Sequence, residues 1–229
     1  MASKPASTDS KLKVSSKREL ITNYLVIYNA VSAFFWAAVL LRFLVLFPLV
    51  GTKFVSGGLN DFLRWVQTLM ILEVFHSLFG LVRSPVVTTV MQISSRLLVV
   101  WGVLYPFPDV GQHPAFSTCT IAWCITEIIR YTFYVYTLLR PGPGGVPRWL
   151  VWLRYSAFYV LYPLGAGSEW VLILVSLPDA EQFSTWYALL LKASLLIYIP
   201  GFYVMFTHVV KQRKKVLGRA PIPKIKKNA

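Results

Sequence analysis

Two residues in an apolar stretch of the chain, Tyr162 and Glu169, have side chains suited to proton transfer. They are seven positions apart, so on a regular helix they share one face and lie about 10.5 Å apart along its axis. A carboxylate among apolar side chains serves as a general base, and a tyrosine that stays protonated serves as a proton donor. Together the two residues provide the groups that a 1,2-elimination requires.

The separation between this phenol and this carboxylate is large for two groups that must act on adjacent carbon atoms. Pro163, Gly165 and Gly167 lie between them. Proline lacks a backbone N–H and clashes with the preceding turn, and glycine lowers helix propensity. We therefore expect this segment to kink or unwind, which would bring Tyr162 and Glu169 to one substrate.

The elements that must position these residues are membrane helices. Of the 229 residues, 56% are hydrophobic and 14% are charged, which excludes an ordinary soluble domain. The apolar residues form continuous blocks of about 20 residues, long enough for a helix to cross a hydrocarbon core of about 30 Å and unlike the alternating strands of a membrane barrel. We predict an all-α, six-transmembrane-helix bundle with spans near residues 24–47, 62–82, 86–105, 116–139, 149–176 and 185–209.

The bundle is expected to occupy residues 24–210, between a disordered basic tail (1–23) and a second basic tail (211–229). The formal net charge of +14 is concentrated in these tails and in loops on one side of the membrane, whereas the opposite side keeps Lys53. This positive-inside pattern predicts cytosolic termini and an even number of spans. Binding to anionic membrane lipid explains the basic tails, and we expect no nucleic-acid partner.

Two further signals concern boundaries and location. The segments Pro106–Asp109 and 141–145, the latter reading Pro-Gly-Pro-Gly-Gly, cannot continue a helix, so they separate spans, and Ser84-Pro85 opens the third span. The last four residues, Lys-Lys-Asn-Ala, match the di-lysine pattern of membrane proteins retrieved to the endoplasmic reticulum. This ending predicts a protein of the endoplasmic reticulum membrane.

Charged residues also occur deep within the predicted spans. Glu73, Arg96 and Glu127 each lie about 15–18 Å from the start of their span, close to the midplane of the membrane. Glu–Arg pairs can offset the cost of burying such charges. Two interpretations are open: ion pairs that only join helices, or a hydrated cavity, which we favour for the set as a whole. The supporting network is predicted to contain Glu73, His76, Gln92, Arg96, Glu127, Arg130, Tyr131, Arg154 and Tyr155.

Metal chemistry is not expected from this sequence. His76 is better explained as a hydrogen-bonding core residue than as a ligand, and Cys119 and Cys124, five positions apart, point in different directions on a helix. No metal-ligand spacing is present in the sequence, and we expect no cofactor.

Several of these polar motifs occur in the order found in a known family. The sequence Glu73-Val-Phe-His76, the run Gln92-Ile-Ser-Ser-Arg96, the run Thr126-Glu127-Ile-Ile-Arg130-Tyr131 and the segment Tyr162-Pro163 with Glu169 resemble the very-long-chain 3-hydroxyacyl-CoA dehydratases. These proteins are also called protein-tyrosine-phosphatase-like, and the plant members are of the pasticcino type. The resemblance covers about residues 24–215.

This resemblance implies an enzyme with six spans in the endoplasmic reticulum, which performs the third step of fatty-acid elongation. That step dehydrates 3-hydroxyacyl-CoA to trans-2-enoyl-CoA. The family's catalytic pair falls on Tyr162 and Glu169, and we assign Glu169 as base and Tyr162 as acid, with the reverse assignment as the alternative. Implied partners are the acyl-CoA substrate and the other elongase subunits, namely the condensing enzyme and the ketoacyl and enoyl reductases. Candidate CoA contacts are Arg83, Arg140 and Arg148.

Three other functions fit the sequence less well. A catalytically silent elongase scaffold or acyl-CoA-binding protein would have been free to lose Tyr162 and Glu169. A transporter would use the midplane charges, but the sequence has no internal repeat. A phosphatase is suggested by the spacing Cys124-x5-Arg130, but the intervening residues are apolar and do not form a glycine-rich phosphate loop.

Overall fold

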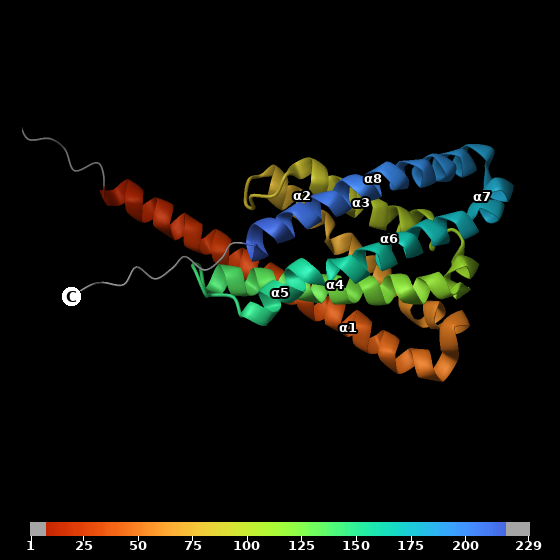
Figure 1. Ribbon diagram of the computed structural model, residues 1–229, viewed down its shortest axis with the longest axis horizontal. Coiled ribbons are helices and arrows are strands. Elements are labelled where there is room, and N and C mark those ends of the chain that lie inside the picture. Colours follow the sequence, from red (N-terminus) through yellow and green to blue (C-terminus); the bar gives the residue numbers. More distant parts are fainter. Residues whose placement is uncertain (1–7, 219–229) are drawn as a thin grey trace, which may run out of the picture.

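The computed structural model describes residues 8–218, and the regular structure within them is helical (Figure 1). No β-strand occurs between residues 8 and 218, which confirms the predicted all-α class. The elements are α1 (Thr8–Leu69), α2 (Ile71–Leu78), α3 (Val86–Gly102), the short 3-10 helix η1 (Pro108–Gln112), α4 (Pro114–Leu139), α5 (Arg148–Ser156), α6 (Phe158–Val175), α7 (Leu177–Phe183) and α8 (Thr185–Leu217).

The long helices fit a membrane bundle. Three helical stretches have the length and apolar composition to cross a membrane: Ser16–Leu78, Arg148–Val175 and Thr185–Leu217. A shorter apolar helix covers Val86–Gly102, and the 26 residues of α4 extend over about 39 Å. In Figure 1 these helices run alongside one another. Helices occupy most of each of the six predicted spans.

The first and second predicted spans are joined by a sharp reversal at Gly51. This residue has φ 70° and ψ −177°, a backbone conformation that residues with a β-carbon rarely adopt. In Figure 1 the orange ribbon of α1 turns at the lower right of the molecule and then runs back toward the bundle. The two halves of α1 therefore form a helical hairpin, although helix continues on both sides of the turn.

We expect Gly51→Ala to lower the free energy of unfolding by about 1–3 kcal/mol, because alanine is strained at this φ and ψ. A β-carbon at Gly51 would meet no atom within 4 Å, so crowding adds nothing to this cost. Thermal unfolding of the purified protein in detergent measures the effect. Gly57→Ala is the matched control, since Gly57 lies in helical backbone with equally open space, and there alanine should be neutral or stabilising. Equal melting temperatures for the two variants would contradict this account of the turn.

The helices extend further into both tails than the sequence predicted. α1 begins at Thr8 and α8 continues to Leu217, so residues 8–23 and 211–217 are helical where tails were expected. Each extension continues a helix that already exists, so it needs no new nucleation, and its lysine, leucine and arginine residues are good helix formers. The di-lysine ending lies outside the described residues.

The predicted helix breaks at proline and glycine are present. Pro85 precedes the first residue of α3, and the loop after α4 contains Gly142 and Gly144 with φ of 120° and 83°. In Figure 1 this loop, the α2–α3 turn, the first turn of α5 and the last turns of α8 lie toward the left-hand end of the bundle. The described chain begins and ends on that side as well.

Large apolar side chains line both the interior and the exterior of the bundle. Trp36 and Phe43 of α1 pack into one buried core with Trp123 of α4, and α4 contacts both α1 and α6. On the outer surface Phe34 and Ile197 are 69% and 65% exposed. A surface this apolar is expected for helices that face lipid.

Candidate active site

Glu169 lies buried in the middle of α6, the helix that also carries Tyr162. The helix is continuous through Pro163 and both glycines, so the expected unwinding between Tyr162 and Glu169 is wrong. The interruption comes earlier, at Ala157, where α5 ends and α6 begins. A proline ring crowds the carbonyl four residues earlier, here that of Tyr159, yet α6 continues through this position, so Pro163 does not account for the interruption at Ala157.

Gly165 has a packing role in this helix. A β-carbon at this position would lie 3.6 Å from Ala122 Cβ and 3.9 Å from Trp123 Cδ1, both on α4. A methyl group would fit there in ordinary van der Waals contact, whereas a side chain longer than that of alanine would push α6 away from α4. A small residue at this position lets α6 approach α4 closely, which keeps Glu169 near the residues of α4 that contact it.

Two side chains from other helices hold the Glu169 carboxylate. Trp123 of α4 donates its indole N–H to Oε1 over 2.8 Å, and Tyr198 of α8 donates its hydroxyl to Oε2, also over 2.8 Å. The Tyr198 hydroxyl is also 3.5 Å from the carbonyl oxygen of Ser95 on α3. Glu169 thus lies where α3, α4, α6 and α8 meet.

Tyr162 is half-buried on the same face of α6 and contacts the aromatic residues of α8. Its ring stacks on Phe202 with centroids 5.2 Å apart and an interplanar angle of 29°, and it also lies near Phe206. Among the described residues its hydroxyl forms no hydrogen bond with Glu169. Along the axis of α6 the two residues are separated by about two helical turns.

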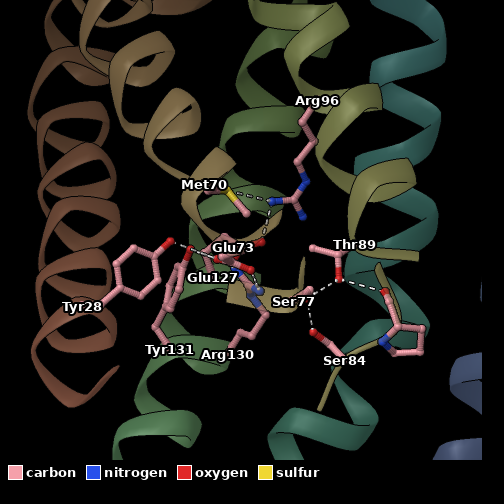
Figure 2. A network of polar contacts seen from close by, with 11 residues as sticks. Tyr28, Met70, Glu73, Ser77, Ser84, Thr89, Arg96, Glu127, Arg130 and Tyr131 are labelled. Carbon is pink, nitrogen blue, oxygen red and sulfur yellow. Dashed lines mark hydrogen bonds and ion pairs between the residues drawn. The ribbon is translucent and has the colours of Figure 1, made fainter. Parts of the chain in front are cut away.

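The deep charged residues form one network of ion pairs (Figure 2). Arg130 of α4 binds Glu73 of α2 through two nitrogens, at 2.6 and 2.7 Å, and its Nε is 2.6 Å from Glu127 Oε2. Arg96 of α3 donates to the other oxygen of Glu127. Three helices therefore meet at one depth, as the sequence predicted. Since the charges contact one another directly, the arrangement matches the ion-pair interpretation better than a hydrated cavity.

Tyrosine and histidine side chains complete the Glu73 end of this network. Figure 2 shows Tyr131 of α4 and Tyr28 of α1 directed toward Glu73; Tyr131 donates to it, and the Tyr28 hydroxyl is 3.5 Å from it. His76 is 2.8 Å from the Tyr24 hydroxyl through Nε2 and packs edge-on against both Tyr24 and Tyr28. His76 is thus a hydrogen-bonded core residue, as predicted.

The network reaches the Glu169 site through an aromatic ring. The guanidinium carbon of Arg96 lies 5.4 Å from the centroid of the Trp123 ring, and Trp123 in turn donates to Glu169. Sequence reasoning missed Trp123 and Tyr198, because an aromatic residue within an apolar span gives no local sign of what it contacts.

Other predicted residues lie away from this network. Gln92 is exposed on α3, and Arg154 lies over the rings of Tyr134 and Tyr155, 6.0 and 5.8 Å from their centroids. Tyr155 packs edge-on against Phe133. The candidate CoA contacts are exposed, in or beside the loops that follow α2 and α4: Arg83, Arg140 and Arg148.

Known proteins are similar in sequence to this chain over most of its length. Residues 67–219 match the family described as "Protein tyrosine phosphatase-like protein, PTPLA". A Schizosaccharomyces pombe protein named probable very-long-chain (3R)-3-hydroxyacyl-CoA dehydratase is 47% identical over 199 residues, which are 86% of this chain and 94% of the relative. The chain belongs to this protein tyrosine phosphatase-like family. No solved structure matches it.

Relatives in this dehydratase family extend across kingdoms. The rice very-long-chain (3R)-3-hydroxyacyl-CoA dehydratase PASTICCINO 2A is 41% identical over 212 residues, covering 86% of this chain and 94% of its own length. Human very-long-chain (3R)-3-hydroxyacyl-CoA dehydratase 2 is 34% identical over 213 residues, with coverage of 87% and 82%. The names of these relatives confirm the resemblance to the 3-hydroxyacyl-CoA dehydratases that the polar motifs indicated.

The phosphatase-like part of the family description does not describe the chemistry of this site. Cys124 is fully buried within α4. The guanidinium of Arg130, on the same helix, already forms ion pairs with Glu73 and Glu127. A tyrosine phosphatase needs a loop whose backbone N–H groups bind phosphate. Here the corresponding N–H groups are used within a continuous helix, so this spacing forms no phosphate cradle.

Proposed function

We propose that this protein removes water from 3-hydroxyacyl-CoA to give trans-2-enoyl-CoA, with Glu169 and Tyr162 as the catalytic pair. The observation that carries the proposal is the buried Glu169 carboxylate, held by neutral donors and sharing a helix face with Tyr162. The names of the family's curated members support the reaction type. The reaction is a carbon–oxygen lyase step, the third of the fatty-acid elongation cycle.

The buried carboxylates differ in their suitability as bases. Glu73 and Glu127 are bound to arginine, so their charge is already neutralised by a partner. Glu169 accepts hydrogen bonds from an indole and a phenol, and no ion pair of Glu169 is described between residues 8 and 218. A carboxylate without a bound cation is the one best placed to accept a proton from substrate.

The elimination uses both members of the pair. Glu169 takes the proton from C2, the electrons of that C–H bond form the C2–C3 double bond, and the C3–O bond breaks. Tyr162 protonates the departing hydroxyl, which leaves as water. The thioester carbonyl next to C2 stabilises the negative charge that develops there. Loss of the proton from Glu169 to water and gain of a proton from water by the Tyr162 phenolate then restore the enzyme.

The substrate is expected to enter from the end of the bundle that carries the basic loops. Arg83, Arg140 and Arg148 are exposed there and can bind the phosphates of CoA, while the acyl chain lies among apolar helices. We place this end and both termini in the cytosol, with the protein in the endoplasmic reticulum membrane beside the condensing enzyme and the two reductases of elongation.

Conversion of 3-hydroxyacyl-CoA by purified protein in liposomes tests this function directly. We expect enoyl-CoA to form from (3R)-3-hydroxyacyl-CoAs in a series of graded chain lengths, with a mass loss of one water detected by mass spectrometry. Liposomes without protein provide the background. A folded protein that converts none of the chain lengths, yet still binds other elongase subunits, would support the scaffold alternative and contradict the proposal.

A further inference from the structure

Helix α8 lies against α6 so that one of its residues faces each member of the catalytic pair. Tyr198 bonds Glu169, and Phe202, one turn later on α8, stacks on Tyr162. The two helices are antiparallel: Tyr198, the earlier of the two α8 residues, meets the later α6 residue of the pair, and Phe202 meets the earlier one. The side chain of Glu169 is thus held from outside its own helix.

Both oxygens of this carboxylate have a donor. Trp123 is 2% exposed and Glu169 is 6% exposed, so little water can replace the indole N–H at Oε1. The Tyr198 hydroxyl occupies one direction at Oε2. Each carboxylate oxygen can accept two hydrogen bonds, so one direction on each oxygen stays free for a substrate proton.

We propose that Tyr198 and Trp123 are positioning residues for the dehydration, each holding one oxygen of Glu169 so that the carboxylate faces C2 of the substrate. This inference rests on the function proposed above and adds two residues to it. A base that is fixed before substrate binds loses no time or free energy in reorientation, and small displacements of a base strongly reduce rates. Tyr198 does not react with substrate in this scheme but acts through Glu169.

Tyr198→Phe is the sharper test, because it removes only the hydroxyl and keeps the ring. Trp123 also packs against Arg96, so changing it would disturb the ion-pair network as well. We expect Tyr198→Phe to lower kcat by about 10- to 100-fold, which is the effect of losing one hydrogen bond to a charged group. KM should change less than about twofold, because no contact with substrate is lost.

Tyr187→Phe is the matched control. Tyr187 lies on the same helix and donates its hydroxyl over 2.6 Å to the carbonyl of Gly102, so the same atom and a comparable hydrogen bond are lost. This variant should keep kcat within about twofold of the wild type. If both variants lost activity together with thermal stability, Tyr198 would have a structural role only and the proposal would be overturned.

A combined variant tests whether Tyr198 acts through Glu169. Glu169→Asp withdraws the carboxylate by one methylene, so the Tyr198 hydrogen bond is already broken in that background. Adding Tyr198→Phe should then reduce kcat by less than about threefold, whereas two independent losses would multiply. Multiplicative losses, or an unchanged kcat in Tyr198→Phe alone, would overturn the assignment.

Chemical labelling separates this inference from the proposed function. If the wild type converts no substrate, the function fails, yet the hydrogen bond can still be tested with a hydrophobic carbodiimide that modifies buried carboxyl groups. We expect peptide mass spectrometry to show faster labelling of Glu169 in Tyr198→Phe than in the wild type or Tyr187→Phe. Equal labelling in all three proteins would show that Tyr198 does not hold Glu169.

Discussion

Replacing Glu169 by Gln, or Tyr162 by Phe, is expected to reduce dehydration of 3-hydroxyacyl-CoA by about 10²- to 10⁴-fold, the usual contribution of one general acid or base. Gln has the shape of Glu but cannot take a proton, and Phe keeps the ring that stacks on Phe202. Both variants should therefore fold normally. The measurement is the initial rate of enoyl-CoA formation by purified protein in liposomes.

Two controls carry the same chemical changes away from the site. Tyr159 lies one turn before Tyr162 on α6 and packs on Phe158 and Phe206, and Glu181 pairs with Lys192 on the surface. We expect Tyr159→Phe and Glu181→Gln to keep rates within about twofold of the wild type. Wild-type activity in either Glu169→Gln or Tyr162→Phe would remove that residue from the site.

The same variants decide which residue is the acid. A substrate analogue with fluoride at C3 needs less help from a proton donor, because fluoride leaves without being protonated. If Tyr162 is the acid, this analogue should restore activity to Tyr162→Phe but not to Glu169→Gln, since the C2 proton must still be removed. Rescue of Glu169→Gln instead would reverse the two roles.

Arg130→Gln is expected to lower the free energy of unfolding by about 3–5 kcal/mol, because it leaves the partly buried Glu73 without a cation and the buried Glu127 with Arg96 alone. Arg130 contacts Glu73 through two nitrogens and Glu127 through a third, and together with Tyr131 it joins α4 to α2 in the network. Thermal unfolding in detergent measures this loss. Arg130→Lys should lose less than Arg130→Gln, since it keeps the charge but not the planar fork of donors.

Lys192→Gln is the control for loss of a charge that is not buried. Lys192 and Glu181 are 47% and 55% exposed, so their ion pair is screened by solvent and should be worth less than about 1 kcal/mol. A loss for Arg130→Gln as small as that for Lys192→Gln would show that the network contributes little to the fold.

The sequence alone determined those features that depend on neighbours along one helix. Continuous apolar blocks predicted the helical membrane bundle, and proline and glycine predicted its breaks at Pro85 and at residues 141–145. The seven-residue spacing placed Tyr162 and Glu169 on one face of α6. Equal depth along three spans anticipated that Glu73, Arg96 and Glu127 would meet. Residue type and helical spacing along each single segment are enough for these predictions.

Only the tertiary structure decided which side chains meet across helices. Trp123 and Tyr198 bind Glu169, while Gln92, although four residues from Arg96, points outward. The reversal at Gly51 and the break at Ala157 were likewise not predicted. Contacts of this kind depend on how far each helix is rotated and shifted against its neighbours, and the packing of the whole bundle sets those values. A periodic pattern identifies the face of a helix, but it does not identify the residue on the next helix that the face meets.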